Sequence, residues 1–236
     1  MLRVAREFGL SETAFVLETN KTGSYAIRYF SPKKEIPLCG HATLAAAKVI
    51  FKNAPGNEIH FITAEKLDLL ITRRDDAITM AFPVYDTIDA ITPPAMLQAL
   101  GLAEVINTAF SIKNKIFLLE INDANVLAAL DPDFIALLSS CDHINGVLVT
   151  ASSNTPGYDF HYRYFWPWAG TNEDPVTGGV QTFLAKYWSE KLNKKIMKAF
   201  QSSGRTGYMQ VELQGETVLV TSHAVIILEG ELVAFD

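Results

Sequence analysis

The sequence predicts an α+β protein made of two related domains, and three observations lead to that prediction. Short β-branched and aromatic runs outnumber helical patterns and are joined mostly by short polar turns, as in largely antiparallel sheets. The string Arg28-Tyr29-Phe30-Ser31-Pro32 returns, with one change, as Arg163-Tyr164-Phe165-Trp166-Pro167, 135 positions later. Each copy is followed by a glycine-containing turn that opens a buried helical segment, which indicates an internal duplication.

The first half predicts one hairpin, one buried helix and three further strands. The hairpin turns at Asn20-Lys21-Thr22-Gly23, and the helix is apolar and rich in alanine on most sides. In order, these elements are strands 14–17 and 25–30, a helix over 40–52, and strands 58–63, 67–72 and 78–82. The proline-containing stretch 84–94 is the best linker, so we expect domains over 1–86 and 87–236.

The second half repeats the plan around its own helix. A hairpin around Gln214-Gly215 ends it, and we expect the last residues to return to the first domain. In order, the predicted elements are a helix at 95–100, strands 105–112 and 116–121, two short helices across 124–139, strands 146–151 and 158–165, a central helix over 176–192, strands 208–213 and 217–221, and a closing apolar segment at 224–228.

Composition excludes several classes of protein. The 236 residues hold 20 Lys+Arg against 26 Asp+Glu, a net charge of −6, which argues against a general nucleic-acid binder. No apolar run approaches the roughly 18 residues that a membrane helix needs, and the first residues do not form a signal peptide. Cys39 and Cys141 are too few for a disulfide framework or a four-thiolate metal site, which favours the reducing cytoplasm.

The two glycine turns are candidate anion-binding sites. The amides that open a helix lack partners and lie at the positive end of its dipole, so Gly40 in the first turn and Thr177, Gly178 and Gly179 in the second suit a carboxylate. The alternative is that these glycines only allow tight turns and close packing. The duplication, together with a titratable residue at each turn, favours a site between the domains for a small anionic substrate.

Those titratable residues are His41 and Asp174, and Glu12 is a third candidate. Taken singly, each has an ordinary explanation: a surface or core histidine, an aspartate that caps a helix, and a surface carboxylate. Glu173 is expected in solvent. The other histidines show no metal-ligand spacing with each other or with the cysteines, and no nucleotide-binding glycine motif or nucleophile elbow occurs, so we predict neither a metal nor a cofactor.

Four motifs, in order along nearly the whole chain, resemble the phenazine biosynthesis-like PhzF isomerase/epimerase family. They are Leu10-Ser11-Glu12-Thr13-Ala14-Phe15, Leu38-Cys39-Gly40-His41-Ala42-Thr43, Glu173-Asp174-Pro175-Val176-Thr177-Gly178 and Ser203-Gly204-Arg205-Thr206-Gly207-Tyr208. The family is similar in fold to diaminopimelate epimerase. The resemblance therefore implies two like domains, each a sheet rolled around a central helix, with the active site in the cleft between them.

The resemblance also implies a reaction. Glu12 would act as the general base and acid that moves a proton between carbons of a small carboxylic acid, without metal or organic cofactor. Gly40, His41 and Asp174 would bind the substrate and assist proton transfer, and the protein would be a homodimer. A racemase with two thiols is disfavoured, because the second turn has Asp174 where a cysteine would be needed.

Two departures from the family pattern motivate an alternative function. The family string Thr-Gly-Ser-Ala-His is here Thr177-Gly178-Gly179-Val180-Gln181, which removes a serine hydroxyl and a histidine. The first domain is also short at its amino end, lacking about two strands, so another subunit is expected to cover the gap if the fold is not truncated. The alternative is a catalytically impaired or inactive relative that acts as a small-anion-binding or protein-interaction module.

Overall fold

Strands dominate the computed structural model, which describes residues 1–233. No helix in that range is long and apolar enough to cross a membrane. The helices are α1 Leu2–Phe8, α2 Gly40–Asn53, α3 Pro94–Leu100, α4 Ala124–Ala128, α5 Phe134–Ser139 and α6 Gln181–Leu192, with a 3₁₀ turn at Pro167–Ala169. The strands are β1 Thr13–Glu18, β2 Ser24–Phe30, β3 Glu35–Ile36, β4 Glu58–Ile62, β5 Asp68–Arg74, β6 Ala77–Pro83, β7 Ile88–Asp89, β8 Asn107–Ser111, β9 Ile116–Ile121, β10 Gly146–Ser152, β11 Phe160–Trp166, β12 Thr171–Glu173, β13 Ile196–Gln201, β14 Gly207–Gln214 and β15 Thr217–Ser222.

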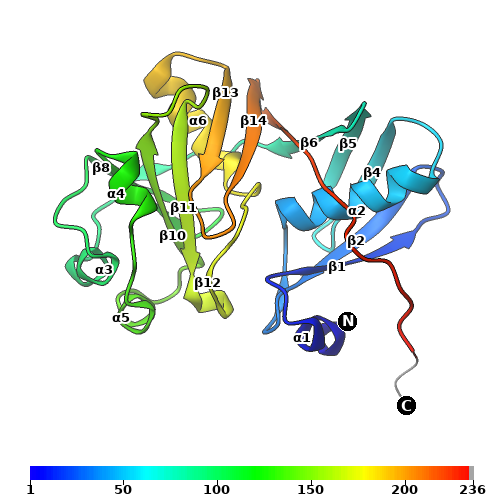
Figure 1. Cartoon of the computed structure of the whole chain (residues 1–236), viewed down its shortest axis with the longest axis horizontal. Coiled ribbons are helices and arrows are strands. Elements are labelled where there is room, and N and C mark those ends of the chain that lie inside the picture. The colour runs from blue at the N-terminus through cyan, green and yellow to red at the C-terminus, as the bar shows by residue number, and fades with distance from the viewer. Residues whose placement is uncertain (234–236) are drawn as a thin grey trace.

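One hydrogen-bonded path of strands runs through both halves of the chain. Its order is β1-β2-β4-β5-β6-β15-β14-β13-β11-β10-β9-β8-β7, with β3 paired to β2 and β12 to β11. Most neighbours are antiparallel, as predicted, whereas β2–β4, β9–β10 and β11–β13 are parallel. The pairing of β6 with β15 connects the two halves, which lie side by side in Figure 1.

Two hydrophobic clusters fill the structure. The larger one contains the buried faces of both α2 and α6, including Phe51 and Trp188, so it extends from one half into the other. The smaller one, with Leu127 and Leu137 at its centre, lies under α3, α4 and α5, which cover the outer side of the second half (Figure 1). The two glycine turns that precede α2 and α6 are therefore held by one shared core.

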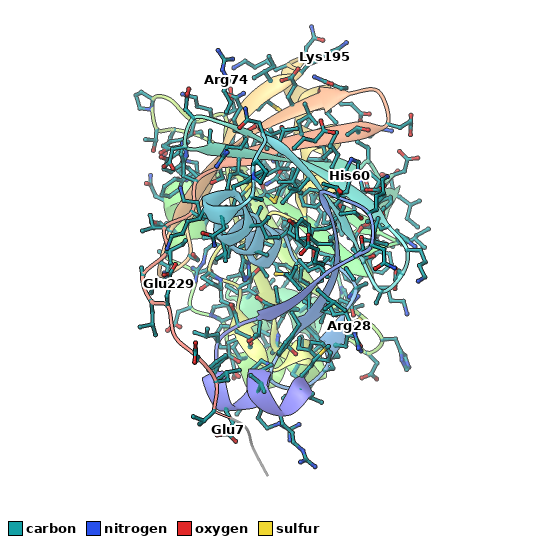
Figure 2. The ribbon with its side chains drawn as sticks, turned by 90° about the vertical axis from the view of Figure 1, so that its right-hand side faces the viewer. Glu7, Arg28, His60, Arg74, Lys195 and Glu229 are labelled. Atoms are coloured by element: carbon teal, nitrogen blue, oxygen red, sulfur yellow. The ribbon has the colours of Figure 1, made fainter. Side chains whose placement is uncertain are left out.

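The internal repeat extends to the side chains. The Arg28 guanidinium donates two hydrogen bonds to Glu35, of 2.8 and 2.7 Å, and Arg163 donates two to Glu173, of 2.7 and 2.8 Å. The first pair lies at the surface, where Arg28 is labelled in Figure 2, and the second is largely buried. The expectation that Glu173 lies in solvent is therefore wrong, because the carboxylate is ion-paired with Arg163.

The structure differs from the predicted elements at several places, among them the short strands β3, β7 and β12, which were not predicted. The central helix of the second half begins at Gln181 rather than 176, because Gly178 and Gly179 accept turn-type hydrogen bonds from Gln181 and Thr182 instead of continuing an α-helix. Strand β13 was not predicted. The closing segment forms no strand up to residue 233, but it runs along α2 (Figure 1), where Lys52 donates a 2.5 Å hydrogen bond to Glu229.

Candidate active site

Three titratable side chains from distant parts of the chain meet beside the two glycine turns. Glu12 comes from the bend between α1 and β1, His41 from the first turn of α2, and Asp174 from the end of β12. His41 Nε2 lies 2.7 Å from Glu12 Oε2, and His41 Nδ1 lies 3.6 Å from Asp174 Oδ1. The carboxylate side chains are almost fully buried, at 1% exposed for Glu12 and 6% for Asp174. The imidazole therefore bridges two buried carboxylates.

The first turn is held by side chains of the first half. Cys39 is the N-cap of α2, and its side chain caps no backbone amide. Thr43 Oγ1 donates a 2.7 Å hydrogen bond back to the Cys39 carbonyl, and the Tyr29 hydroxyl lies 2.6 Å from Thr43 Oγ1. The first backbone amides of α2 lack helical acceptors by geometry, so this end of the helix can receive an anion.

The second turn is held by residues that the sequence motifs did not single out. The Gln201 amide, at the end of β13, donates to the Asp174 carbonyl at 2.6 Å and accepts from the Thr177 amide at 2.5 Å. The Tyr162 hydroxyl donates to the Thr177 carbonyl at 3.0 Å. Thr177 Oγ1 in turn donates to Asp174 Oδ2 at 2.6 Å. These contacts fix the direction of the Asp174 carboxylate.

The two turns touch through their glycines. A β-carbon placed on Gly40 would lie 2.7 Å from Gly178 Cα and 2.9 Å from the Gly179 nitrogen, closer than van der Waals contact allows. A β-carbon on Gly179 would meet nothing within 4 Å. Gly40 is therefore required for backbone-to-backbone contact between the halves, whereas Gly179 faces open space and lines a cavity.

This asymmetry predicts the effects of two alanine substitutions. Gly40→Ala is expected to lower the free energy of unfolding by about 1–3 kcal/mol, since the added methyl group must push two backbones apart. Gly179→Ala, the matched control, is expected to leave the stability nearly unchanged. Urea denaturation of both variants checks this, and equal stability of the two would contradict the close contact.

Burial and neighbouring charges shift the pKa values of the site. Burial raises the pKa of Asp174 to about 6, although the nearby His41 opposes that shift and Glu12 adds to it. For His41, burial lowers the pKa, but the interactions with Cys39, Glu12 and Asp174 outweigh it and hold the pKa well above its ordinary value. Burial also raises the pKa of the Cys39 thiol to about 11. Near neutral pH, the site thus holds a thiol and an imidazolium beside two carboxyl groups.

A cavity of about 250 Å³ opens onto this cluster. Both halves of the chain line it: Glu12, Cys39 and Gly40 come from the first, and Asp174 and Gly179 from the second. The lining also includes two cations, two further carboxylates and three aromatic rings: Lys34, Lys113, Glu35, Glu65, Tyr85, Tyr164 and Trp166. The size of the cavity and its buried proton carriers suit a small organic acid.

The predicted site residues Glu12, Gly40, His41, Asp174, Thr177, Gly178 and Gly179 therefore lie around one place in the structure. The sequence missed the supporting residues Gln201 and Tyr162. Tyr162 precedes the second Arg-Tyr-Phe string by one position, so only its place beside the repeat pointed to it. Gln201 had no signal, because its strand was not predicted.

Known proteins resemble the chain over nearly its full length. The family model described as phenazine biosynthesis-like protein matches residues 1–230. An uncharacterized isomerase of Pseudomonas aeruginosa is 38% identical over 231 residues, which are 97% of this chain and 85% of that protein. Phenazine biosynthesis-like domain-containing protein 1 of Mus musculus is 35% identical over 253 residues, 98% of this chain and 88% of its own.

Solved structures show the same likeness. A phenazine biosynthesis protein of the PhzF family from Enterococcus faecalis has a TM-score of 0.86 and 33% sequence identity, covering 99% of this chain and 86% of its own. A probable proline racemase from Agrobacterium radiobacter has a TM-score of 0.59 at 12% identity, over 93% of this chain and 76% of its own, a likeness of fold alone. The predicted diaminopimelate epimerase-like α+β fold is thereby confirmed.

Proposed function

The chain belongs to the phenazine biosynthesis-like PhzF family, which has isomerases among its members, and on that premise we propose that it isomerises a small carboxylic acid by moving a proton between two carbons. The observation that carries this proposal is the contact of His41 with both Glu12 and Asp174, two buried carboxylates that line a cavity shared by both halves. Such a set of buried acid and base groups is what proton transfer requires.

In this reaction Glu12 is the proton carrier. Its carboxylate takes a proton from a carbon of the substrate, so that a C–H bond breaks and an O–H bond forms. The double bond of the substrate shifts, and Glu12 returns the proton to another carbon. No proton is gained or lost overall, and the side chains of the chain itself supply the acid and the base, so no cofactor takes part.

His41 and Asp174 keep Glu12 ready for that exchange. His41 Nε2 lies 2.7 Å from Glu12 Oε2, so a second group that can carry a proton stands directly beside the carboxylate. Asp174, with its pKa raised to about 6, is partly protonated near neutral pH. Its Oδ1 lies 3.6 Å from His41 Nδ1, the nitrogen that donates a 2.7 Å hydrogen bond to the Val176 carbonyl. His41 and Asp174 would therefore change their protonation during the reaction. That change would balance the extra negative charge that the substrate carries while Glu12 holds its proton.

The glycine turns would bind the substrate carboxylate. The first amides of α2 have no acceptor within the helix and can donate to an anion, and Gly40 and Gly179 line the same cavity. Backbone donors placed in this way also stabilise the negative charge that develops when the proton leaves. The family pattern has a serine where this chain has Gly179. Since that hydroxyl is missing here, binding of the substrate carboxylate would depend more on the backbone amides.

The test is exchange of a carbon-bound proton with solvent. A panel of small carboxylic acids with an acidic C–H bond would be incubated with the protein in deuterated water and followed by NMR. The expected result is deuterium incorporation into at least one acid, at a rate proportional to protein concentration. Saturable binding of an acid without any incorporation would contradict an isomerase and would favour the anion-binding alternative.

A further inference from the structure

We propose that Tyr164 and Trp166, on strand β11, donate hydrogen bonds to a second polar group of the substrate, so that the protein selects carboxylic acids that also carry an oxygen acceptor such as a carbonyl or hydroxyl group. This selectivity rests on the isomerase function proposed above, because it concerns the substrate of the same cavity. Both side chains line that cavity. They alternate along the strand and share one face of it, with ring centroids 5.8 Å apart. We call them the donor pair.

The indole N–H of Trp166 has no acceptor in the chain. Of the three tryptophans, the other two have one: Trp168 Nε1 donates to a main-chain carbonyl at 3.0 Å, and Trp188 Nε1 donates to Thr150 Oγ1 at 2.9 Å. Trp166 is 7% exposed, and its buried Nε1 meets no acceptor among residues 1–233. A buried donor without a partner is rare, because it has lost its water and gained nothing in return. An acceptor on a bound molecule would remove that cost.

The Tyr164 hydroxyl has a distant acceptor. It donates to the Asn145 carbonyl over 3.4 Å, well beyond the about 2.7–2.8 Å that is typical of a hydroxyl donor. Its counterpart in the internal repeat, Tyr29, has a close partner, since that hydroxyl lies 2.6 Å from Thr43 Oγ1. In the first half the tyrosine hydroxyl is thus held by the helix that follows, whereas in the second half it lies beside Asn145 in the lining of the cavity.

The backbone around Asn145 is fixed, so its carbonyl is held at that distance. The Asn145 amide donates to the Lys115 carbonyl at 2.7 Å, and its side-chain Nδ2 donates to the Asn114 carbonyl at 2.7 Å. A β-carbon on the next residue, Gly146, would lie 2.6 Å from Tyr164 Cε2 and 2.8 Å from the Tyr164 hydroxyl oxygen. The glycine therefore makes room for the hydroxyl end of Tyr164, while the hydrogen bond of that hydroxyl stays long.

The donor pair belongs to the surroundings of the proton-transfer groups. The Tyr164 carbonyl accepts a 3.1 Å hydrogen bond from the Asp174 amide. Burial raises the pKa of the Tyr164 hydroxyl well above its ordinary value, and the charges of Asp174 and Glu12 add to that shift. The hydroxyl therefore keeps its proton near neutral pH and acts as a donor. With the substrate carboxylate at the glycine turns and its second acceptor at the donor pair, the carbon skeleton would lie between them in the cavity that Glu12 lines.

This arrangement predicts discrimination between acids of similar size. A ligand without a second acceptor would leave both donors unpaired, and a site built to hydrogen-bond a ligand strongly rejects an analogue that lacks the matching group. Purely apolar acids should therefore bind less tightly than acids of the same size that carry an oxygen acceptor.

Matched pairs of acids test this selectivity by binding alone. The pairs are pentanoate with 4-oxopentanoate, cyclohexanecarboxylate with 3-oxocyclohexanecarboxylate, and benzoate with 3-hydroxybenzoate, each titrated into the wild-type chain by calorimetry. At least one acceptor-bearing acid is expected to bind about tenfold or more tightly than its parent, the effect of two hydrogen bonds. If no acceptor-bearing acid binds more tightly than its parent, as expected when water serves the donor pair, the selectivity is refuted.

Two variants assign the preference to the donor pair. Trp166→Phe and Tyr164→Phe each keep an aromatic ring but remove one donor, so each should weaken binding of the preferred acid by about 3–10-fold and leave its parent unchanged. Trp168→Phe is the control, because Trp168 does not line the cavity and its N–H already has an acceptor. The preference should persist in that control. Equal losses for both acids in the first two variants would show that the rings act only in packing and would overturn the assignment.

The indole protons give a second measurement that needs no variant to bind ligand. Labelling with ¹⁵N-tryptophan is expected to give three Nε1–H signals in NMR, and the signal missing from Trp166→Phe identifies Trp166. The preferred acid should shift that signal downfield, because a new hydrogen bond deshields the proton, and its parent should not. Equal shifts with both acids would count against the donor pair. An acid that binds with this signature but exchanges no deuterium would contradict the isomerase function and not the donor pair.

Discussion

Glu12→Gln is expected to lower the rate of deuterium exchange into the responsive acid by about 10²–10⁴-fold, the range that a general acid–base group contributes. Glutamine keeps the size and shape of glutamate but does not accept a proton from carbon. The carboxylate lies 2.7 Å from His41 Nε2, and the replacement removes the negative charge from that buried pair. NMR exchange rates are therefore compared at a temperature at which circular dichroism shows that both proteins are folded.

The matched control is Glu7→Gln. Glu7 lies on α1 and, like Glu12, precedes β1 in the sequence. Its side chain, however, is exposed at one end of the molecule (Figure 2). Its replacement changes the net charge by the same amount and should leave the exchange rate unaltered. Persistence of rapid exchange in Glu12→Gln would remove Glu12 from the role of proton carrier, and equal losses in both variants would point to charge alone.

Arg163→Met is expected to lower the free energy of unfolding by about 3–5 kcal/mol, the effect of removing one partner from a buried ion pair. The guanidinium does more than pair with Glu173, because it also donates to the carbonyls of Leu127, Ala128 and Leu130 at the end of α4. Methionine keeps the packing volume but leaves the Glu173 carboxylate and those carbonyls without a donor. Guanidinium denaturation measures the change.

The internal repeat provides the control for this experiment. Arg28 forms the same two hydrogen bonds with Glu35, and both arginines lie over the phenylalanine two positions later, at 5.3 and 4.9 Å. The first pair is in solvent, so Arg28→Met should give no resolvable change in stability. The two variants thus compare one interaction at two depths. Similar stability of both variants would contradict the importance of burial at Arg163.

Much of the fold follows from local patterns, and its exceptions have physical reasons. The hairpin of β1 and β2 and the helix α2 were predicted because alternation, a glycine turn and an alanine-rich run are strong local signals. Strand β13 was missed because Lys194, Lys195 and Lys198 in and beside it interrupt the apolar pattern, although its buried positions alternate regularly. The three parallel pairings depend on contacts between distant segments, which no local pattern reports.

The site was predicted in a different way. Taken singly, Glu12, His41 and Asp174 had ordinary explanations. The duplicated glycine turns favoured a site that includes His41 and Asp174, and the resemblance to a family added Glu12 to it. Their mutual distances come from the packing of two halves on one core, which is a property of the whole chain. Glu173 was misjudged for the same reason, because the partner that buries it, Arg163, lies on a neighbouring strand.

The pairing of β6 with β15 also has a consequence for how the protein is made. Thr79 and Thr221 share a 2.8 Å hydrogen bond across that pairing, although 142 positions separate them. A ribosome that adds about 5–20 residues per second needs roughly 7–28 s to reach the second strand after the first. Throughout that time, the edge of β6 is open to pairing with any other strand, including one from a neighbouring nascent chain. The strand that joins the two halves is thus synthesised long after its partner.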